Sequence, residues 1–245
     1  MISTGIVVYG DSAPLLKSMT QWKQSFGESP LCVVNNHPTL RSPQELDGDN
    51  SHFEFSAYRI LCEKLEGDGP FIIANDTLFR NHWQKGWAKM LRLAIRRMDV
   101  SVNIVWGDIR RDGNSIPERP DPFLASWIFV IPNRAVLKQF AEVLDDLCNT
   151  ELPEPSPAYA SFLTWWTAPA RRFRGWHGAR TPEDIARKVR CIRLEHALSK
   201  SLPAAGLPIR SLGTLAPLQY AFLRIVDRLR TRMDAWSYRY FSEMK

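Results

Sequence analysis

Carboxylate and amide side chains close three short apolar runs in the first third of the chain. The runs cover residues 5–10, 31–34 and 71–74, and the polar residues that follow them are Asp11, Asn35, Asn36, Asn75 and Asp76. Amide and carboxylate oxygens accept hydrogen bonds from ligand hydroxyl and N–H groups, and carboxylates also bind Mg²⁺. The spacing therefore predicts a ligand site assembled from residues far apart in the sequence.

Asp76 is the most informative of these residues. It follows a buried-type strand and precedes a helix-like stretch. A carboxylate at such a position can hold Mg²⁺ or Mn²⁺ across two phosphates and so neutralise a diphosphate leaving group. Alternatively, Asp76 caps the helix that begins near Leu78. The two roles can coexist, and the local sequence leaves both open.

Strand-like and helix-like segments alternate along residues 1–150. Leu15, Met19, Trp22 and Phe26, for example, recur at helical spacing after the first apolar run. Further strands are predicted at 102–105 and 127–131, with a polar loop at 110–122 between them. This alternation predicts an α/β domain with a largely parallel sheet covered on both faces. In such sheets ligands bind at the carboxyl ends of the strands.

A proline-rich break at 151–157 separates this domain from a helical region over 151–245, which we expect to pack on it. The last predicted helix has an apolar stripe from Leu215 to Tyr240. The arginines that flank this stripe are Arg224, Arg228, Arg232 and Arg239. Cations beside an apolar stripe suit an anionic membrane surface. The alternative is a helix packed on the domain, with its arginines in water or paired with acidic neighbours.

Composition excludes several classes of protein. The 245 residues are 44% hydrophobic and 24% charged, which is typical of a soluble globular protein. No CxxC, GxGxxG or GxxxxGK[ST] motif occurs, which argues against zinc ribbons, dinucleotide-binding dehydrogenases and P-loop enzymes. The start lacks signal-peptide features, so we expect a cytoplasmic protein, peripheral on the inner face of the membrane if the last helix binds there.

Several of these segments, taken in order, resemble a known family. The segments are Val33-Val34-Asn35-Asn36, Asp49-Asn50 with Glu54 and Ala57-Tyr58, and 71–77. Their order is similar to that in GT-A-fold glycosyltransferases, above all the family-2-type and rhamnosyltransferase-like enzymes of bacterial polysaccharide synthesis. Residues 126–147 and the set Lys188, Glu195, Leu198-Ser199 and Gly206 resemble later parts of those enzymes.

The resemblance implies a GT-A-like fold, a nucleotide-sugar donor and a glycan or lipid-linked glycan acceptor. It assigns donor contacts to Asp11, Asn35, Asn36, Asn50, Glu54, Asn75 and Asp76. Asp76 would also be the ligand of Mg²⁺ or Mn²⁺. Because the sequence has Asn75-Asp76 where many of these enzymes have Asp-x-Asp, metal dependence stays open.

Transfer with inversion needs a general base that takes the proton of the acceptor hydroxyl. Asp121, just before a predicted strand, is our candidate, whereas Asp145-Asp146 falls on the polar face of a helix. A basic aromatic loop at 171–177 could close over a diphosphate through Arg174 and His177. It could equally be a loop in water. For His196, on an apolar helical face, we predict a hydrogen-bonded core role.

Two other functions compete with the transferase hypothesis. The first is a catalytically inactive GT-A-like scaffold or partner protein, because a full Asp-x-Asp motif and a clear base are missing. The second is a basic nucleic-acid-binding protein that uses its arginines and tryptophans. Since no helix-turn-helix, RRM or KH signature occurs, we expect no nucleic-acid partner.

Overall fold

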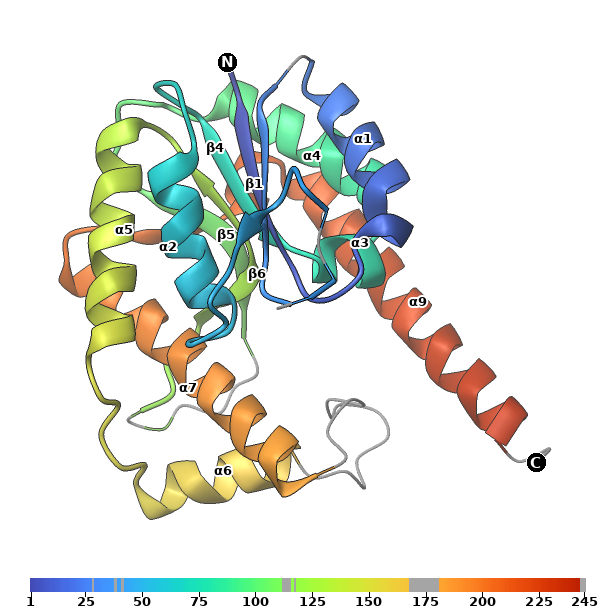
Figure 1. Cartoon of the computed structure of the whole chain (residues 1–245), viewed down its shortest axis with the longest axis vertical. Coiled ribbons are helices and arrows are strands. Elements are labelled where there is room, and N and C mark those ends of the chain that lie inside the picture. The colour runs from blue at the N-terminus through green and yellow to red at the C-terminus, as the bar shows by residue number, and fades with distance from the viewer. Residues whose placement is uncertain are drawn as a thin grey trace.

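The computed structural model describes residues 1–27, 29–37, 39–40, 42–111, 116, 118–167 and 181–242, with side chains of the last helix described up to 229. These residues form an α/β fold around one seven-stranded mixed sheet in the order β3-β2-β1-β4-β6-β5-β7 (Figure 1). The strands are β1 (Ser3–Val8), β2 (Leu31–Asn35), β3 (Leu46–Asp47), β4 (Phe71–Asn75), β5 (Val105–Arg110), β6 (Phe123–Ile131) and β7 (Ile209–Ser211). The predicted α/β class is thereby confirmed.

The sheet is parallel except at β6. Strand β1 pairs in parallel with β2 on one side and with β4 on the other. Strand β6 runs antiparallel to both β4 and β5, and β7 is parallel to β5. The chain thus proceeds from β1 outward to β3 and then returns to place β4 against the other edge of β1. Such a switch of direction opens a crevice at the carboxyl ends of the two central strands.

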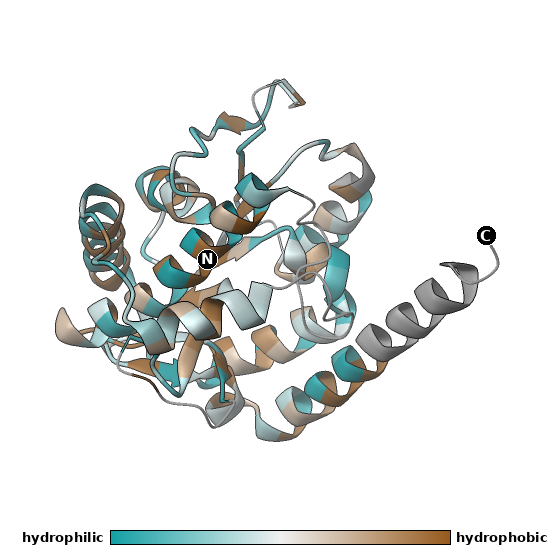
Figure 2. Cartoon of the chain, turned by 90° about the horizontal axis from the view of Figure 1, so that it is seen from below, coloured by the Kyte–Doolittle hydropathy of each residue, from teal (hydrophilic) through white to brown (hydrophobic). Residues whose placement is uncertain are grey.

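Helices cover both faces of the sheet (Figure 1). One layer contains α1 (Leu16–Ser25), α4 (Gln84–Arg97), α8 (Leu212–Leu215) and α9 (Pro217–Ser242), and the other contains α2 (Glu54–Lys64), α5 (Arg134–Asn149) and α7 (Pro182–Ala204). The short η1 (Ala13–Leu15) and α3 (Thr77–Asn81) follow β1 and β4, and α6 (Pro157–Thr167) packs on α7. In the view of Figure 2, α9 runs out from one side of the molecule.

Helix α7 begins with a capping box. The Thr181 side chain accepts a hydrogen bond from the Asp184 backbone N–H, the Asp184 carboxylate accepts one from the Thr181 N–H, and Pro182 occupies the first turn. Farther along, Leu194, Leu198 and Leu202 bury themselves against the sheet. This fixes the rotation of α7, and with it the residues that the helix directs toward the carboxyl edge.

The structure differs from the sequence prediction around β5. The strand expected at 102–105 begins at Val105 and continues to Arg110, with Asp108 inside it and fully buried. A charged residue in a strand argues against burial, but Asp108 accepts hydrogen bonds from Trp127 Nε1 at 2.9 Å and Arg224 Nη1 at 3.1 Å. These donors stabilise the carboxylate within the sheet.

The region after residue 150 is continuous with the sheet. Strand β7 adds to its edge beside β5, and α7 and α9 share the two cores on either face of it. None of the described helices combines the length and apolar content needed to span a bilayer.

Candidate functional site at the carboxyl edge

Asp76 lies at the end of β4 with only 7% of its surface exposed. Its Oδ2 accepts a hydrogen bond from Arg80 Nε at 2.8 Å. The Asp76 side chain makes no capping bond to α3; instead the Asn75 Oδ1 accepts from the Thr77 N–H at 3.1 Å. The capping role considered for Asp76 therefore falls to Asn75. Asp76 is instead paired with Arg80, whose side chain is about half exposed.

The environment of Asp76 favours its protonated form. Burial raises the pKa of this carboxyl, and the Glu54 charge adds to the increase. Arg80 and the backbone of Tyr9 oppose the shift but do not cancel it. A carboxyl with a raised pKa at the ligand-binding edge of a sheet is a common feature of functional sites.

Asn35 and Asn36, at the end of β2, were both predicted to contact the ligand, and they differ in role. Asn35 is fully buried, and its Nδ2 donates to the Gly10 and Leu40 carbonyls. Those bonds give Asn35 a structural role. Asn36 donates from Nδ2 to the Phe53 carbonyl at 2.8 Å, whereas its buried Oδ1 accepts no hydrogen bond from the residues that the structure describes.

The loop before α2 carries a second acceptor of this kind. Asn50 Oδ1 is also buried without a hydrogen-bond donor among the described residues. Asn50 and Phe53 have φ angles of 51° and 57°, a left-handed conformation that costs free energy for residues other than glycine. Unsatisfied buried acceptors and a strained loop occur together at functional sites, where a ligand supplies the missing donors.

Asp11 serves the turn after β1. It is exposed, and its Oδ1 accepts from the Ala13 N–H at 2.9 Å. This bond satisfies the first backbone N–H of η1, so the structure gives Asp11 a role in the turn itself.

Glu54 lies at the centre of a buried polar cluster at the start of α2. Its carboxylate accepts from Tyr9 Oη at 3.2 Å and from Ser126 Oγ at 3.0 Å, and Cys191 Sγ lies 3.5 Å from both oxygens. Burial and the Glu54 charge raise the pKa of Tyr9, and burial and Glu54 likewise raise that of Cys191. Glu54 therefore connects β1, β6 and α7 across the carboxyl edge.

Glu195 of α7 brings a second carboxyl to this cluster, and the sequence did not single it out as a site residue. Its Oε1 accepts from the Ser126 N–H at 2.6 Å, so Ser126 bonds to Glu195 through its backbone and to Glu54 through its hydroxyl. Burial raises the pKa of Glu195, against the opposing charges of Arg110 and Lys188. In the sequence, Glu195 appears only as part of the resemblance, because it comes from a helix more than a hundred residues after Glu54.

The remaining predicted residues lie elsewhere. Asp121 precedes β6 by two residues, and its charge acts on Arg119, whose guanidinium carbon lies 4.3 Å from the centre of the Phe162 ring. This places Asp121 toward α6. Arg174 and His177 lie outside the described residues.

The side chains around Asp76 do not form a metal-binding set. Across the described part of the chain, no three His, Cys, Asp or Glu side chains come together in a way that could hold a metal ion. Mg²⁺ or Mn²⁺ at Asp76 would compete with the Arg80 guanidinium for the same oxygen. The Glu54 oxygens are already bonded to Tyr9 and Ser126. We therefore derive no chemical step through a metal.

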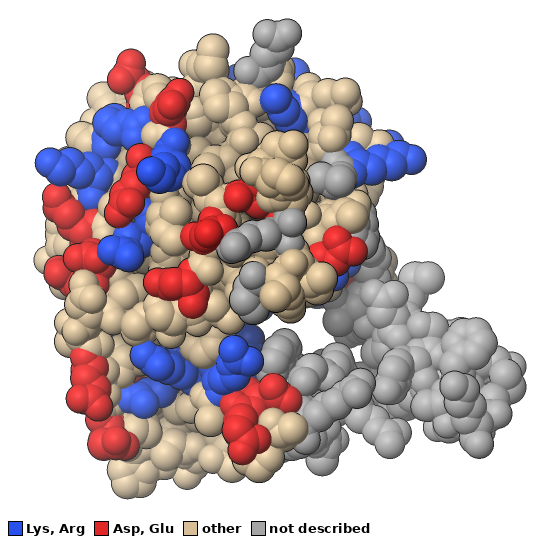
Figure 3. Space-filling model, in the orientation of Figure 1, with Lys and Arg blue, Asp and Glu red and all other residues tan. Residues whose placement is uncertain are grey.

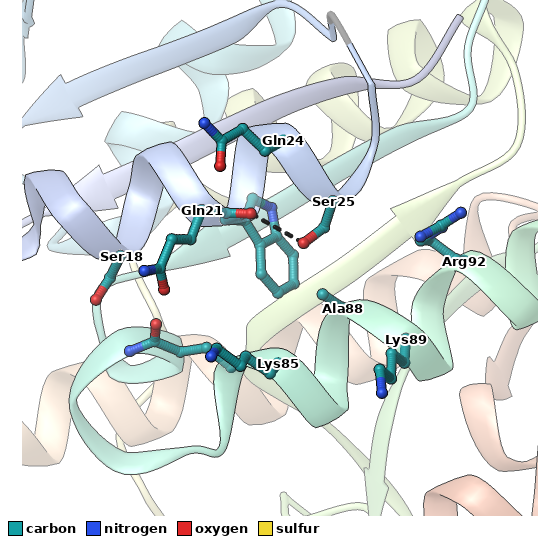
Figure 4. A pocket seen from close by; sticks show the side chains of 10 residues that line it. Ser18, Gln21, Gln24, Ser25, Lys85, Ala88, Lys89 and Arg92 are labelled. Carbon is teal, nitrogen blue, oxygen red and sulfur yellow. Dashed lines mark hydrogen bonds between the residues drawn. The ribbon is translucent and has the colours of Figure 1, made fainter.

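A pocket of about 410 Å³ lies between α1 and α4 (Figure 4). Ser18, Gln21, Gln24 and Ser25 of α1 face Lys85, Ala88, Lys89 and Arg92 of α4 across it. None of the carboxyl-edge residues described above lines this pocket. It is an alternative location for a small ligand.

Comparison with known protein families, curated proteins and solved structures gave no match to this chain.

Proposed function

We propose that this protein is a glycosyltransferase that moves a sugar from a nucleotide-sugar donor to a glycan or lipid-linked glycan acceptor in bacterial surface polysaccharide synthesis. One observation carries the proposal. At the carboxyl edge, Asn36 and Asn50 each hold a buried amide oxygen for which the described residues supply no donor; Asn50 belongs to the strained loop at 50–53, and Asn36 is hydrogen-bonded to that loop through the Phe53 carbonyl. A nucleoside with its N–H and hydroxyl groups supplies the donors that these oxygens lack.

The charged residues suit the rest of such a donor. Arg80 is held by Asp76 and still has about half of its side chain exposed, so it can approach an anionic phosphate. Arg80 would then counter the charge that develops on the departing nucleoside diphosphate. The resemblance in sequence to GT-A glycosyltransferases assigns the donor phosphates to the same strand end.

The transfer itself needs a base. The acceptor hydroxyl oxygen forms a bond to the anomeric carbon, its proton passes to a carboxylate, and the nucleoside diphosphate leaves with the electron pair of the broken bond. Asp121 remains our candidate from the sequence. Glu195 is the candidate that the geometry adds, because its raised pKa and its link to Glu54 place a proton-accepting group at the carboxyl edge.

A thermal-shift screen with nucleoside diphosphates and nucleotide-sugars, with and without Mg²⁺ or Mn²⁺, tests the proposal. Binding to the native state raises the unfolding temperature. Asn50→Gly removes the amide oxygen and tolerates the left-handed backbone, so it should abolish the nucleotide-induced shift. Asn103→Gly, in an exposed loop, is the matched control and should retain it. If none of the nucleotides changes the unfolding temperature and the protein is retained on an oligonucleotide column, the results would favour a nucleic-acid-binding protein.

The hydrogen bonds of Asp76 and Glu54 also support a second function, that of an inactive scaffold. The carboxylates of Asp76 and Glu54 are both bonded to side chains of the protein itself. An inactive scaffold with a GT-A-like fold would have this property. Nucleotide binding without release of diphosphate from any nucleotide-sugar would identify it.

A further inference from the structure

The outward face of α9 is apolar. Leu218, Phe222, Ile225 and Leu229 are 80%, 55%, 56% and 52% exposed. Their spacing of four, three and four residues puts them in one line along the helix. From Leu218 to Leu229 the apolar stripe that the sequence predicts thus faces away from the protein, whereas its first residue, Leu215, lies in α8 and packs against the core.

Buried polar contacts fix this orientation of α9. On the opposite side of the helix, Asp227 accepts from His82 Nδ1 at 2.6 Å and Trp87 Nε1 at 3.0 Å. One turn earlier, Arg224 donates to the fully buried Asp108. Turning the apolar stripe inward would break these charge-assisted bonds, so the stripe needs a partner outside the described chain.

A row of cations lies on the neighbouring helix. Lys85, Lys89, Arg92 and Arg96 of α4 are exposed and follow the same spacing, and neither α4 nor α1 contains an Asp or Glu. Three of these cations are visible in Figure 4. By contrast, Figure 3 shows charges of both signs interspersed over α2 and α5.

Trp83 connects the two rows. Its side chain is 39% exposed, and its ring centre lies 6.2 Å from that of Phe222. Helices α4 and α9 pack against each other in one layer, since a Cβ at Gly86 would touch Leu223. Their outward faces therefore form one continuous surface, which we call the α4–α9 face: the four α4 cations, Trp83 and the four apolar residues of α9.

We propose that the α4–α9 face docks on a lipid bilayer that contains anionic phospholipids. Apolar side chains on a helix enter the headgroup–acyl boundary, an aromatic residue suits the same depth, and adjacent Lys and Arg bind lipid phosphates. A second copy of the chain is a poorer occupant, because it would bring another row of cations to the interface. This inference is independent of the proposed transferase activity.

Co-sedimentation of the full chain with vesicles tests the proposal. Binding to phosphatidylcholine vesicles that include about 30% phosphatidylglycerol should exceed binding to pure phosphatidylcholine, and should weaken as salt is added. Lys85→Gln/Lys89→Gln should lower the affinity about 30-fold. Lys64→Gln/Lys138→Gln, which removes two exposed cations from α2 and α5, should leave it within about twofold of the wild type.

The apolar part of the face has its own variant. Phe222→Ser/Ile225→Ser should release the protein from the vesicles at an unchanged unfolding temperature, since both side chains are already more than half exposed. Equal binding to both vesicle types, or equal loss in the two lysine pairs, would overturn the proposal. So would a dimer in analytical ultracentrifugation that Phe222→Ser/Ile225→Ser dissociates, because the stripe would then be a contact between copies.

Discussion

At the scale of single residues, two carboxyls at the carboxyl edge have raised pKa values, Asp76 and Glu195. Groups of this kind destabilise the folded protein when ionised, and they cluster at functional sites. Folding raises the pKa of Glu195, so its contribution to stability is full below the unfolded-state pKa and is lost as pH rises through the folded-state pKa.

Glu195→Gln should therefore stabilise the protein above neutral pH and impair its activity. At pH 8 we expect the unfolding temperature to rise by roughly 2–4 °C, the shift that about 1 kcal/mol gives in a chain of this size. Sugar transfer should fall at the same time, because the amide accepts no proton. Scanning calorimetry at pH 5 and pH 8 measures the first effect. A lower unfolding temperature for the variant at pH 8 would contradict the assignment.

The burial of His196 leads to a second prediction at the scale of single residues. It is 2% exposed and bonded through Nδ1 to Tyr159 Oη at 2.7 Å, which confirms the core role predicted from sequence. Burial, together with Arg119 and Lys200, lowers its pKa from 6.5 to about 3. The unfolded chain thus binds a proton that the folded one rejects, and stability falls as pH drops below 6.5.

The expected loss is about 2 kcal/mol of unfolding free energy between pH 6.5 and 5, from 1.36 kcal/mol for each unit. The His196→Gln variant should not show this pH-dependent loss of unfolding free energy, and its side-chain amide keeps a polar partner for Tyr159. Urea unfolding of both proteins at the two pH values gives the difference. Parallel losses in the wild type and the variant would show that His196 is already charged in the folded state.

At the scale of elements, the buried Asp108 holds β5, β6 and α9 together. Burial raises its pKa, but Arg110, Arg224, Tyr220 and Trp127 outweigh burial and leave the pKa below its usual value. Removing a buried partner of several charged and polar donors leaves all of them unsatisfied. The network therefore contributes to the position of α9.

Asp108→Ala should cost about 3–5 kcal/mol of unfolding free energy. Asp99→Ala, whose carboxylate lies in an exposed turn, should cost less than about 1 kcal/mol and serves as the control. Denaturant unfolding followed by circular dichroism measures both. Similar costs for the two substitutions would mean that the Asp108 network contributes little.

Sequence pattern predicted most of the helices and strands, because apolar periodicity records which face each element buries. It placed Asn75 and Asp76 at a strand end, where they are. It misplaced β5, because the bonds that make a buried Asp108 acceptable come from residues far along the chain. The inward position of Asn35 and the link between Glu195 and Ser126 depend on tertiary contacts of the same kind.

At the scale of the whole molecule, residues 151–245 complete both the sheet and its two cores. Truncation after residue 150 would expose core side chains that α7 and α9 contact, such as Leu124, bonded through its backbone to Ser199, and Trp87, bonded to Asp227. We expect the fragment 1–150 to lack a cooperative unfolding transition, whereas the full chain unfolds in one. Calorimetry of the fragment decides this, and a sharp transition would show that the first part folds as a separate domain.

The central claim is that a nucleotide binds at the carboxyl edge, and hydrogen exchange on the full chain tests it most directly. Adding a nucleoside diphosphate at saturating concentration should slow amide exchange in segments 35–37, 46–54 and 75–80. The pocket between α1 and α4, covering 18–25 and 84–92, should exchange as before. Slower exchange at that pocket with no change at the three strand-end segments would contradict the account.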